Sequence, residues 1–253
     1  MGSGKATGLA AISGAGALCL VFGRRWHLSW GATAGEQRSP LAGDDLIDRA
    51  DLTATRAITI RCSADEVWPW IAQIGQGRGG MYSYDALENL IGCDMHSADR
   101  IVPDWQNVAV GDSVRLAPEV SLAVSAVERG RALVLSGGVP VGNTAPPYDF
   151  TWSFVIQDGP DGSIRLLVRE RYRYKRVWAR LLVEPIETVS FVMTQRMLRC
   201  IRDRAESAAP SPPATRSPAS ANPSSYATRS PAPGPVASTN STAWSTWSKA
   251  TTS

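Results

Sequence analysis

The sequence predicts a two-layer α+β domain in which a curved antiparallel sheet is covered by a long C-terminal helix. Three observations support this. A strand pattern is followed by a capped helix over residues 54–74, short strand-like segments with hairpin-length links fill residues 113–175, and an apolar stripe at helical spacing covers residues 186–201. A sheet with one apolar face must bury it against another layer, and the terminal helix can provide that layer.

The first strand and helix are predicted by two different periods. Residues 54–61 alternate, with Ile58 and Ile60 on one face. Ser63 and Glu66 then form a capping box at the start of a helix that runs to about Ile74. Its inward positions are Val67, Trp70, Ile71 and Ile74.

A glycine-rich loop over residues 75–80 separates this helix from a second short one. Ser83 can cap the second helix, and Asp85 lies near its positive end. Gly92 is placed where a left-handed helix terminus is favoured. The apolar positions expected to face inward are Tyr84, Leu87, Leu90 and Ile91.

Five further strands are expected near residues 113–117, 120–128, 132–136, 149–157 and 163–175, because turn signals separate them. The last strand has one apolar and aromatic face, interrupted by Glu170. Its other face is a basic row that we interpret as solvated. That row consists of Arg165, Arg169, Arg171, Arg173 and Lys175.

The final helix is predicted from an apolar stripe that must cover the sheet. The stripe consists of Ile186, Val189, Met193, Met197, Cys200 and Ile201. A curved sheet that grips such a helix leaves room for a pocket between the two layers.

Composition bounds the number of domains and the kinds of partner. The 253 residues with 43% hydrophobic content suffice for one domain of roughly 150 residues with appendages. Three of the 26 basic side chains lie in an acid-free C-terminal stretch, so 23 remain against 23 acidic ones over residues 1–206. That balance gives no electrostatic footprint for nucleic acid, and we expect no nucleic-acid partner.

The cysteines and histidines predict neither a metal site nor a cofactor. The chain has no CxxC pair and two histidines, so a zinc site would lack its ligand spacing. We interpret the cysteines as reduced and mostly buried thiols. They are Cys19, Cys62, Cys93 and Cys200.

The two ends are predicted to be appendages. Residues 1–23 carry an apolar run from Ala6 to Phe22, which at about 17 residues is at the lower limit for a membrane-spanning helix. This run has three possible interpretations: a membrane anchor, a secretory signal peptide or a soluble extension. Arg24 and Arg25 follow the run and favour the anchor, and they place the domain in the cytoplasm. Residues 24–44 are expected to be a linker, and residues 207–253 a disordered Ser/Thr/Pro/Ala-rich tail.

Residues 45–206 resemble the START-like or SRPBCC superfamily, specifically its bacterial polyketide-cyclase-like members. The segments that carry the resemblance are TRAITIRCSADEVWPWIAQIG, GQGRGGMYSYDALENLIG, HSADRIVPDWQNVAVGD, RLLVRERYRY and PIETVSFVMTQRML. The resemblance implies a helix-grip fold with two short helices after the first strand, and a cavity that binds lipid-like, polyketide-like or other apolar small molecules. It also places the anchor in a bacterial inner membrane, the alternative being a soluble cytoplasmic protein.

Eight residues are candidates for a ligand site in that cavity. Glu170 could orient a ligand or could form a salt bridge with an arginine such as Arg196, and the aromatic candidates could equally be core residues. Tyr82, Tyr84 and Asp85 could lie at the entrance. The remaining candidates are Trp152, Phe154, Tyr172 and Met193.

Two other sequence features carry groups that can take part in chemistry. The run Gly77–Gly80 could bind an anion through its backbone, although a flexible gate or turn is the simpler interpretation. His96, with Asp94 and Asp99 nearby, could form an acid/base pair, but no nucleophile is clearly placed beside it. We assign no catalytic residue.

The sequence thus favours a non-catalytic binding or carrier module for a hydrophobic small molecule, held at the membrane through residues 6–22. Two alternatives remain open. The first is a polyketide cyclase or dehydratase in which Glu170, Tyr82 or His96 transfers protons. The second is an interaction protein of the chaperone-regulating kind without any ligand.

Overall fold

The structure is a computed structural model, and it describes residues 23–140 and 144–208. In these residues six strands form one sheet in the order β1-β6-β5-β4-β3-β2, and every neighbouring pair is antiparallel. The first strand therefore pairs with the last. The strands are β1 (Leu52–Ile60), β2 (Ser113–Ala117), β3 (Val120–Glu128), β4 (Ala132–Gly137), β5 (Tyr148–Asp158) and β6 (Ile164–Tyr174).

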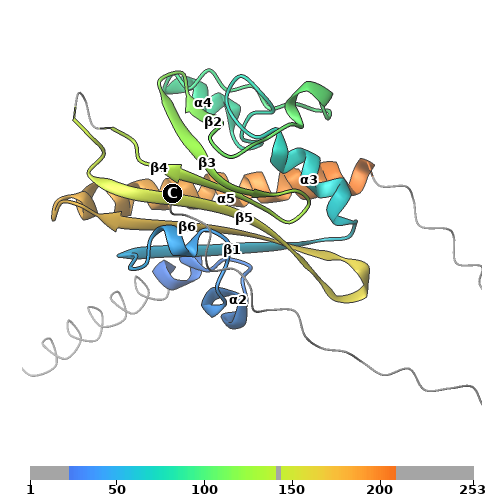
Figure 1. The fold of residues 1–253 in the computed structure, drawn as a ribbon, viewed down its shortest axis with the longest axis horizontal. Coiled ribbons are helices and arrows are strands. Elements are labelled where there is room, and N and C mark those ends of the chain that lie inside the picture. Colours follow the sequence, from blue (N-terminus) through green and yellow to red (C-terminus); the bar gives the residue numbers. More distant parts are fainter. Residues whose placement is uncertain (1–22, 141–143, 209–253) are drawn as a thin grey trace, which may run out of the picture. The chain divides into compact units, whose positions relative to one another are not determined.

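One long helix, α5 (Ala179–Ala208), runs along the sheet (Figure 1). Two short helices, α3 (Ala64–Ala72) and α4 (Asp85–Leu90), follow β1, and α2 (Ala34–Arg38) precedes it. Short 3-10 turns lie at Asp44–Leu46, Pro103–Trp105 and Pro160–Gly162. This order of elements and this sheet confirm the helix-grip fold that the resemblance implied.

The main apolar core lies between the sheet, α3 and the C-terminal half of α5. The capping box is present, with the Glu66 carboxylate accepting a 2.7 Å hydrogen bond from the Ser63 backbone N–H. The four inward positions expected for α3 are all buried, as are Met197, Cys200 and Ile201 of α5. The periodicity of the sequence located this half of the core correctly, because apolar side chains fill it.

The prediction of a solvated basic row on β6 is wrong for Arg169, which is only 2% exposed. Its guanidinium donates to the Thr55 hydroxyl (2.9 Å), to the Ser39 carbonyl (2.9 Å) and to the Asp44 carboxylate (2.5 Å). The N-terminal segment over residues 31–47 thus lies on the outer face of the sheet. The arginines of β6 donate hydrogen bonds to the carbonyl oxygens of that segment, so the segment takes the place of water on this face.

Arg165 and Arg171 extend this attachment along the same face. Arg165 forms an ion pair with Glu36 (2.8 Å) and also donates to the Gly31 carbonyl (2.8 Å). Arg171 donates to the Ile47 carbonyl (2.7 Å). Residues 31–44, which the sequence suggested were a linker, therefore hold fixed contacts with β6.

The segment passes the outer edge of β1 before it reaches the outer face. The Ala57 N–H donates to the Trp30 carbonyl at 3.1 Å, so part of this edge strand is already paired. Gly31 is required there, because its φ is +72° and an added Cβ would lie 2.1 Å from the Ala57 oxygen. In Figure 1 the blue N-terminal part of the described chain, including α2, lies beside β1.

The apolar positions of α4 were predicted to face inward, and this is wrong. Tyr84, Leu87, Leu90 and Ile91 are all exposed, whereas Glu88 is buried. Tyr84, not Ser83, is the residue before the first turn, and the Ser83 hydroxyl instead donates to the Glu88 carboxylate at 2.8 Å. A helix of six residues has too few apolar contacts to set its own orientation, so neighbouring loops decide it.

The N-terminal half of α5 also differs from the prediction. Ile186 and Val189 are exposed, and Met193 is half-buried. Val183, Glu187 and Thr194 take the inward positions. Apolar periodicity failed here because charged and hydroxyl side chains form the inward face.

The predicted membrane anchor and nearly all of the predicted tail lie outside the described residues. Across the chain segments that the structure describes, none of the helices combines the length and the apolar character needed to span a bilayer.

Candidate functional site

A cluster of buried charges fills one end of the space between the sheet and α5. Arg56 on β1 is fully buried, and Glu170 on β6 and Glu187 on α5 are each 1% exposed. The Arg56 Nη1–Glu170 Oε1 distance is 2.9 Å, and Arg56 also forms an ion pair with Glu187 through Nη2. One guanidinium thus bridges two carboxylates, which is the arrangement that buried charges require.

Glu170 has hydrogen-bond partners on two elements besides β1. It accepts from the Tyr172 hydroxyl (3.1 Å), the Ser190 hydroxyl (2.8 Å) and the Thr194 hydroxyl (3.2 Å). Burial, and next the negative charge of Glu170, raise the pKa of Tyr172 well above its ordinary value. Tyr172 therefore stays protonated and acts as a donor to Glu170.

A helical turn over residues 23–28 closes this end of the domain. His27 Nε2 lies 2.6 Å from Glu187 Oε2, and the His27 carbonyl accepts from Arg56 Nε at 3.1 Å. The Phe191 ring lies 5.4 Å from the Arg56 guanidinium carbon and 5.3 Å from the Trp26 ring. The charged cluster is sealed from water by these aromatic and backbone groups.

The salt-bridge interpretation of Glu170 is supported, but its partner is Arg56 and not Arg196. Arg196 is exposed, and its guanidinium lies over the Tyr84 ring at 5.9 Å. Sequence reasoning missed Arg56, Glu187 and His27. A usable signal for Arg56 existed, because it alternates in phase with Ile58 and Ile60 and must share their inner face.

Trp152, Phe154 and Tyr172 lie on neighbouring strands of the inner face, as expected from their alternation. Trp152 is directly opposite Glu170 in the β5–β6 register, and its ring lies 4.8 Å from that of Phe154. Phe154 is fully buried, whereas Trp152 is half-buried. The Trp152 indole N–H has no acceptor among the described residues. Contact of these residues with a ligand stays a prediction.

The glycine loop is a closed turn held by Gln73. The buried Gln73 amide donates to the Tyr82 hydroxyl (2.9 Å) and to the Arg100 carbonyl (3.1 Å), and its oxygen accepts from the Val102 N–H (3.1 Å). Gly75 and Gly80 pair across the loop. Burial raises the pKa of Tyr82 to about 12, so its hydroxyl is a donor or acceptor within this network rather than a base.

The other residues near the loop have structural partners as well. Arg78 donates to the Ala72 carbonyl (3.1 Å) and to the Trp105 carbonyl (2.5 Å), so its charge is directed into the fold. Asp85 accepts from the Ser97 hydroxyl at 2.6 Å. The Met193 sulfur lies 3.9 Å from the Ser83 hydroxyl.

The groups proposed for proton transfer belong to three separate sets of contacts. Glu170 pairs with Arg56, and Tyr82 binds Gln73. His96 is highly exposed, 3.8 Å from Asp94. In the described part of the chain no group of three potential metal ligands occurs. Burial also raises the pKa of Cys62 to about 11, so this thiol stays protonated.

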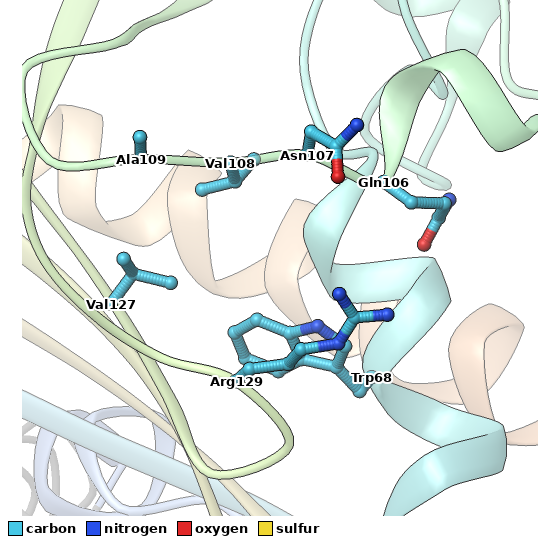
Figure 2. Close-up of a pocket in the computed structure, with 7 residues that line it drawn as sticks. All are labelled: Trp68, Gln106, Asn107, Val108, Ala109, Val127 and Arg129. Carbon is cyan, nitrogen blue, oxygen red and sulfur yellow. The ribbon is translucent and has the colours of Figure 1, made fainter.

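Two hollows lie away from the charged cluster. The smaller has a volume of about 170 Å³ and lies between α3 and the loop before β2, with Trp68 and Arg129 on one side and Gln106, Val108 and other loop residues on the other (Figure 2). Small-molecule sites usually have volumes of about 300–1,000 Å³, so this hollow can admit only part of a ligand.

The larger hollow has a volume of about 430 Å³ and lies where β4 ends and β5 begins. Leu46 and Ile47 of the N-terminal segment border it on the outer face of the sheet. Thr151 is buried within it, and the Thr151 hydroxyl has no hydrogen-bond partner among the described residues. Its other lining residues are Ser136, Gly137, Gly138, Pro146, Tyr148, Asp149, Phe150 and Lys175.

Comparison with known proteins yields structural neighbours without assigning an activity. No family model matches the chain. No curated protein matches it either. A protein from Mesorhizobium loti is 15% identical with a TM-score of 0.38, covering 60% of this chain and 98% of its own.

Two further neighbours have similarly low scores. A hypothetical protein from Helicobacter pylori is 10% identical with a TM-score of 0.42, covering 69% of this chain and 99% of its own. Norcoclaurine synthase from Thalictrum flavum is 13% identical with a TM-score of 0.37, covering 66% of this chain and 92% of its own. At these identities and scores the likenesses assign neither a ligand nor a reaction to this chain.

Proposed function

We propose that the domain is a non-catalytic binding module for an apolar small molecule, and that the 430 Å³ hollow between the N-terminal segment and the β4–β5 end is its site. The observation that carries the proposal is the volume of that hollow, which falls within the usual range of small-molecule sites. Five of its eleven lining residues are apolar or aromatic, and the others are polar residues and glycines.

The polar groups of the hollow suit a ligand with one hydrogen-bonding end. Among the described residues the buried Thr151 hydroxyl has no hydrogen-bond partner, and the Lys175 ammonium lies 2.7 Å from Asp149 at the border. Phe150 connects the hollow to the inner face, because its ring lies 4.7 Å from that of Tyr172. A lipid-like or polyketide-like molecule would place its apolar part against Leu46, Ile47 and Phe150.

In this proposal the charged cluster connects β1, β6 and α5 and is not a reaction centre. Glu170 and Glu187 are each saturated by Arg56 and further donors, so neither carboxylate is available to a substrate proton. General acid–base catalysis requires a group within hydrogen-bond reach of the reacting atom. The sealed position of both carboxylates therefore supports binding over catalysis.

Replacement of Leu46 tests the site. Leu46 is 47% exposed, so Leu46→Ser removes part of the apolar wall without opening the core. We expect the variant to bind the fluorescent probe anilinonaphthalene sulfonate roughly fivefold more weakly, which corresponds to about 1 kcal/mol of lost apolar contact. Fluorescence titration of the full chain measures this.

Leu87→Ser is the matched control, because Leu87 on α4 is 56% exposed and does not border the hollow. We expect it to bind the probe as the unchanged protein does. An equal loss of affinity in both variants, or no loss in Leu46→Ser, would contradict the assignment of the site.

A further inference from the structure

The N-terminal half of α5 has an inverted distribution of side chains. Its inward positions carry Glu187, Ser190 and Thr194, which bind Arg56 and Glu170. Four of its outward positions are apolar and exposed. They are Leu181, Ile186, Val189 and Val192. A helix on the surface of a soluble domain normally carries the opposite pattern.

Exposed apolar residues also lie next to the helix. Val177 and Trp178, in the turn that precedes α5, are exposed, and so is Trp26 on the helical turn before β1. The Trp26 ring packs against α5, because its centroid lies 5.3 Å from that of Phe191. We call these seven residues the α5 apolar face: Trp26, Val177, Trp178, Leu181, Ile186, Val189 and Val192.

Basic side chains border the α5 apolar face at its N-terminal end. Arg176 and Arg180 are exposed there, and Arg25 is exposed on the helical turn that contains Trp26. Arg24 and Arg180 form ion pairs with Glu184, at 2.7 and 3.6 Å. Tryptophan and arginine beside an exposed aliphatic surface are the combination found at the boundary between lipid headgroups and acyl chains.

The described residues begin beside α5. Residues 6–22 are apolar or small throughout, and Gly23 to Leu28 form the turn whose side chains contact α5. A membrane that held residues 6–22 would thus lie next to the α5 apolar face. Contiguous apolar surface of this kind on a soluble domain marks an interaction site.

We infer that the α5 apolar face lies on the surface of an anionic lipid bilayer. The aliphatic side chains enter the boundary between headgroups and acyl chains, the two tryptophans lie at headgroup level, and the surrounding arginines contact lipid phosphates. The inference goes beyond the small-molecule site and does not depend on it, because no residue of the α5 apolar face borders the 430 Å³ hollow.

The test is the chemical accessibility of residue 189 in the full chain. Val189→Cys is treated with a membrane-impermeant maleimide, and peptide mass spectrometry follows residue 189 separately from the native cysteines. We expect vesicles of equal parts phosphatidylcholine and phosphatidylglycerol to slow the reaction about tenfold, because acyl chains exclude the reagent. Vesicles of phosphatidylcholine alone should slow it less, since the arginines then lack anionic partners.

Val110→Cys is the matched control, because Val110 is 63% exposed and Val189 is 62% exposed. Its reaction should be unchanged by vesicles. Slowing at residue 189 only, and only with vesicles, supports the inference.

Four outcomes would overturn it. Equal slowing at both positions indicates non-specific adsorption, and slow reaction at residue 189 without vesicles indicates that another part of the chain covers the helix. Slowing that rises with protein concentration indicates a second copy. Unchanged reaction at residue 189 in a chain that sediments with the vesicles shows that the helix faces away from the membrane.

Discussion

Arg56 holds three parts of the molecule together through one side chain. It binds Glu170 on β6, Glu187 on α5 and the backbone carbonyl of His27. Both carboxylates are buried, so each would lose its cationic partner without regaining hydration if the guanidinium were absent. The ion pairs of Arg56 with Glu170 and Glu187 are not in themselves a large source of stability, because apolar side chains of the same shape could replace all three residues. What the structure cannot tolerate is the loss of one member.

Substitution of Arg56 by methionine should therefore be strongly destabilising. Arg56→Met leaves two carboxylates buried without their cation, and we expect the free energy of unfolding to fall by about 3–5 kcal/mol. Denaturant unfolding measured by circular dichroism checks this. Arg61→Met is the control, since Arg61 is exposed at the end of β1, and it should change stability by no more than about 0.5 kcal/mol. A similar effect in the two variants would show that the cluster does not stabilise the fold.

At the scale of elements, the glycine loop after α3 combines a sterically restricted position with an open one. Gly77 and Gly80 both have φ of +73°, but their surroundings differ. A Cβ on Gly80 would lie 2.7 Å from the His96 oxygen, whereas a Cβ on Gly77 would meet nothing within 4 Å. The loop is thus a packed turn at Gly80 and an open one at Gly77.

Alanine substitutions at the two glycines distinguish the stability cost of backbone strain from the cost of a steric clash. Gly77→Ala should lower the free energy of unfolding by about 1 kcal/mol, the cost of a left-handed conformation for alanine. Gly80→Ala should cost about 1–3 kcal/mol more, because the backbone at His96 must move. Thermal unfolding of both variants measures the difference. Equal effects would mean that the loop shifts freely and is a gate rather than a packed turn.

At the scale of the whole molecule, the N-terminal segment is part of the domain. Residues 23–30 contact α5 and the β1 edge, and residues 31–47 cover the outer face of the sheet through Arg165, Arg169 and Arg171. The 430 Å³ hollow depends on this segment, since Leu46 and Ile47 form one side of it. A domain that began near β1 would lack much of this framework.

Truncation tests this dependence. A chain that begins at residue 45 loses the Glu36 and Asp44 carboxylates that pair with Arg165 and Arg169, and it also loses His27. We expect its free energy of unfolding to be at least about 3 kcal/mol below that of a chain that begins at residue 23, because hydrogen bonds to charged groups contribute about 1.5–3 kcal/mol each. Denaturant unfolding of both chains measures this.

A pair of single substitutions in the full chain serves as the control for truncation. Arg169→Met should reproduce much of the loss and should expose residues 31–47 to limited proteolysis, whereas Arg173→Met should have little effect because Arg173 is exposed on the same strand. If the chain that begins at residue 45 is as stable as the longer one, the segment is only a linker, as its composition suggests.

The sequence by itself determined the six strands, the helices α3, α4 and α5, and the order in which they occur. Alternation in β6, the capping box at Ser63 and the turns between the middle strands depend on neighbours a few residues apart, so local pattern suffices to predict them. It also determined that Glu170 is a carboxylate on an apolar face that needs a partner.

The tertiary structure alone decided which partner that is and what covers each face. Arg56 and Glu170 are 114 positions apart, and Arg169 binds a segment about 130 positions away, so no local period encodes either contact. Because Glu187 and Thr194 meet buried polar groups, the N-terminal half of α5 turns its polar side inward, and its apolar side is left exposed. Hydrophobic periodicity assumes that the interior is apolar, and it misassigns a helix wherever buried charges occupy that interior.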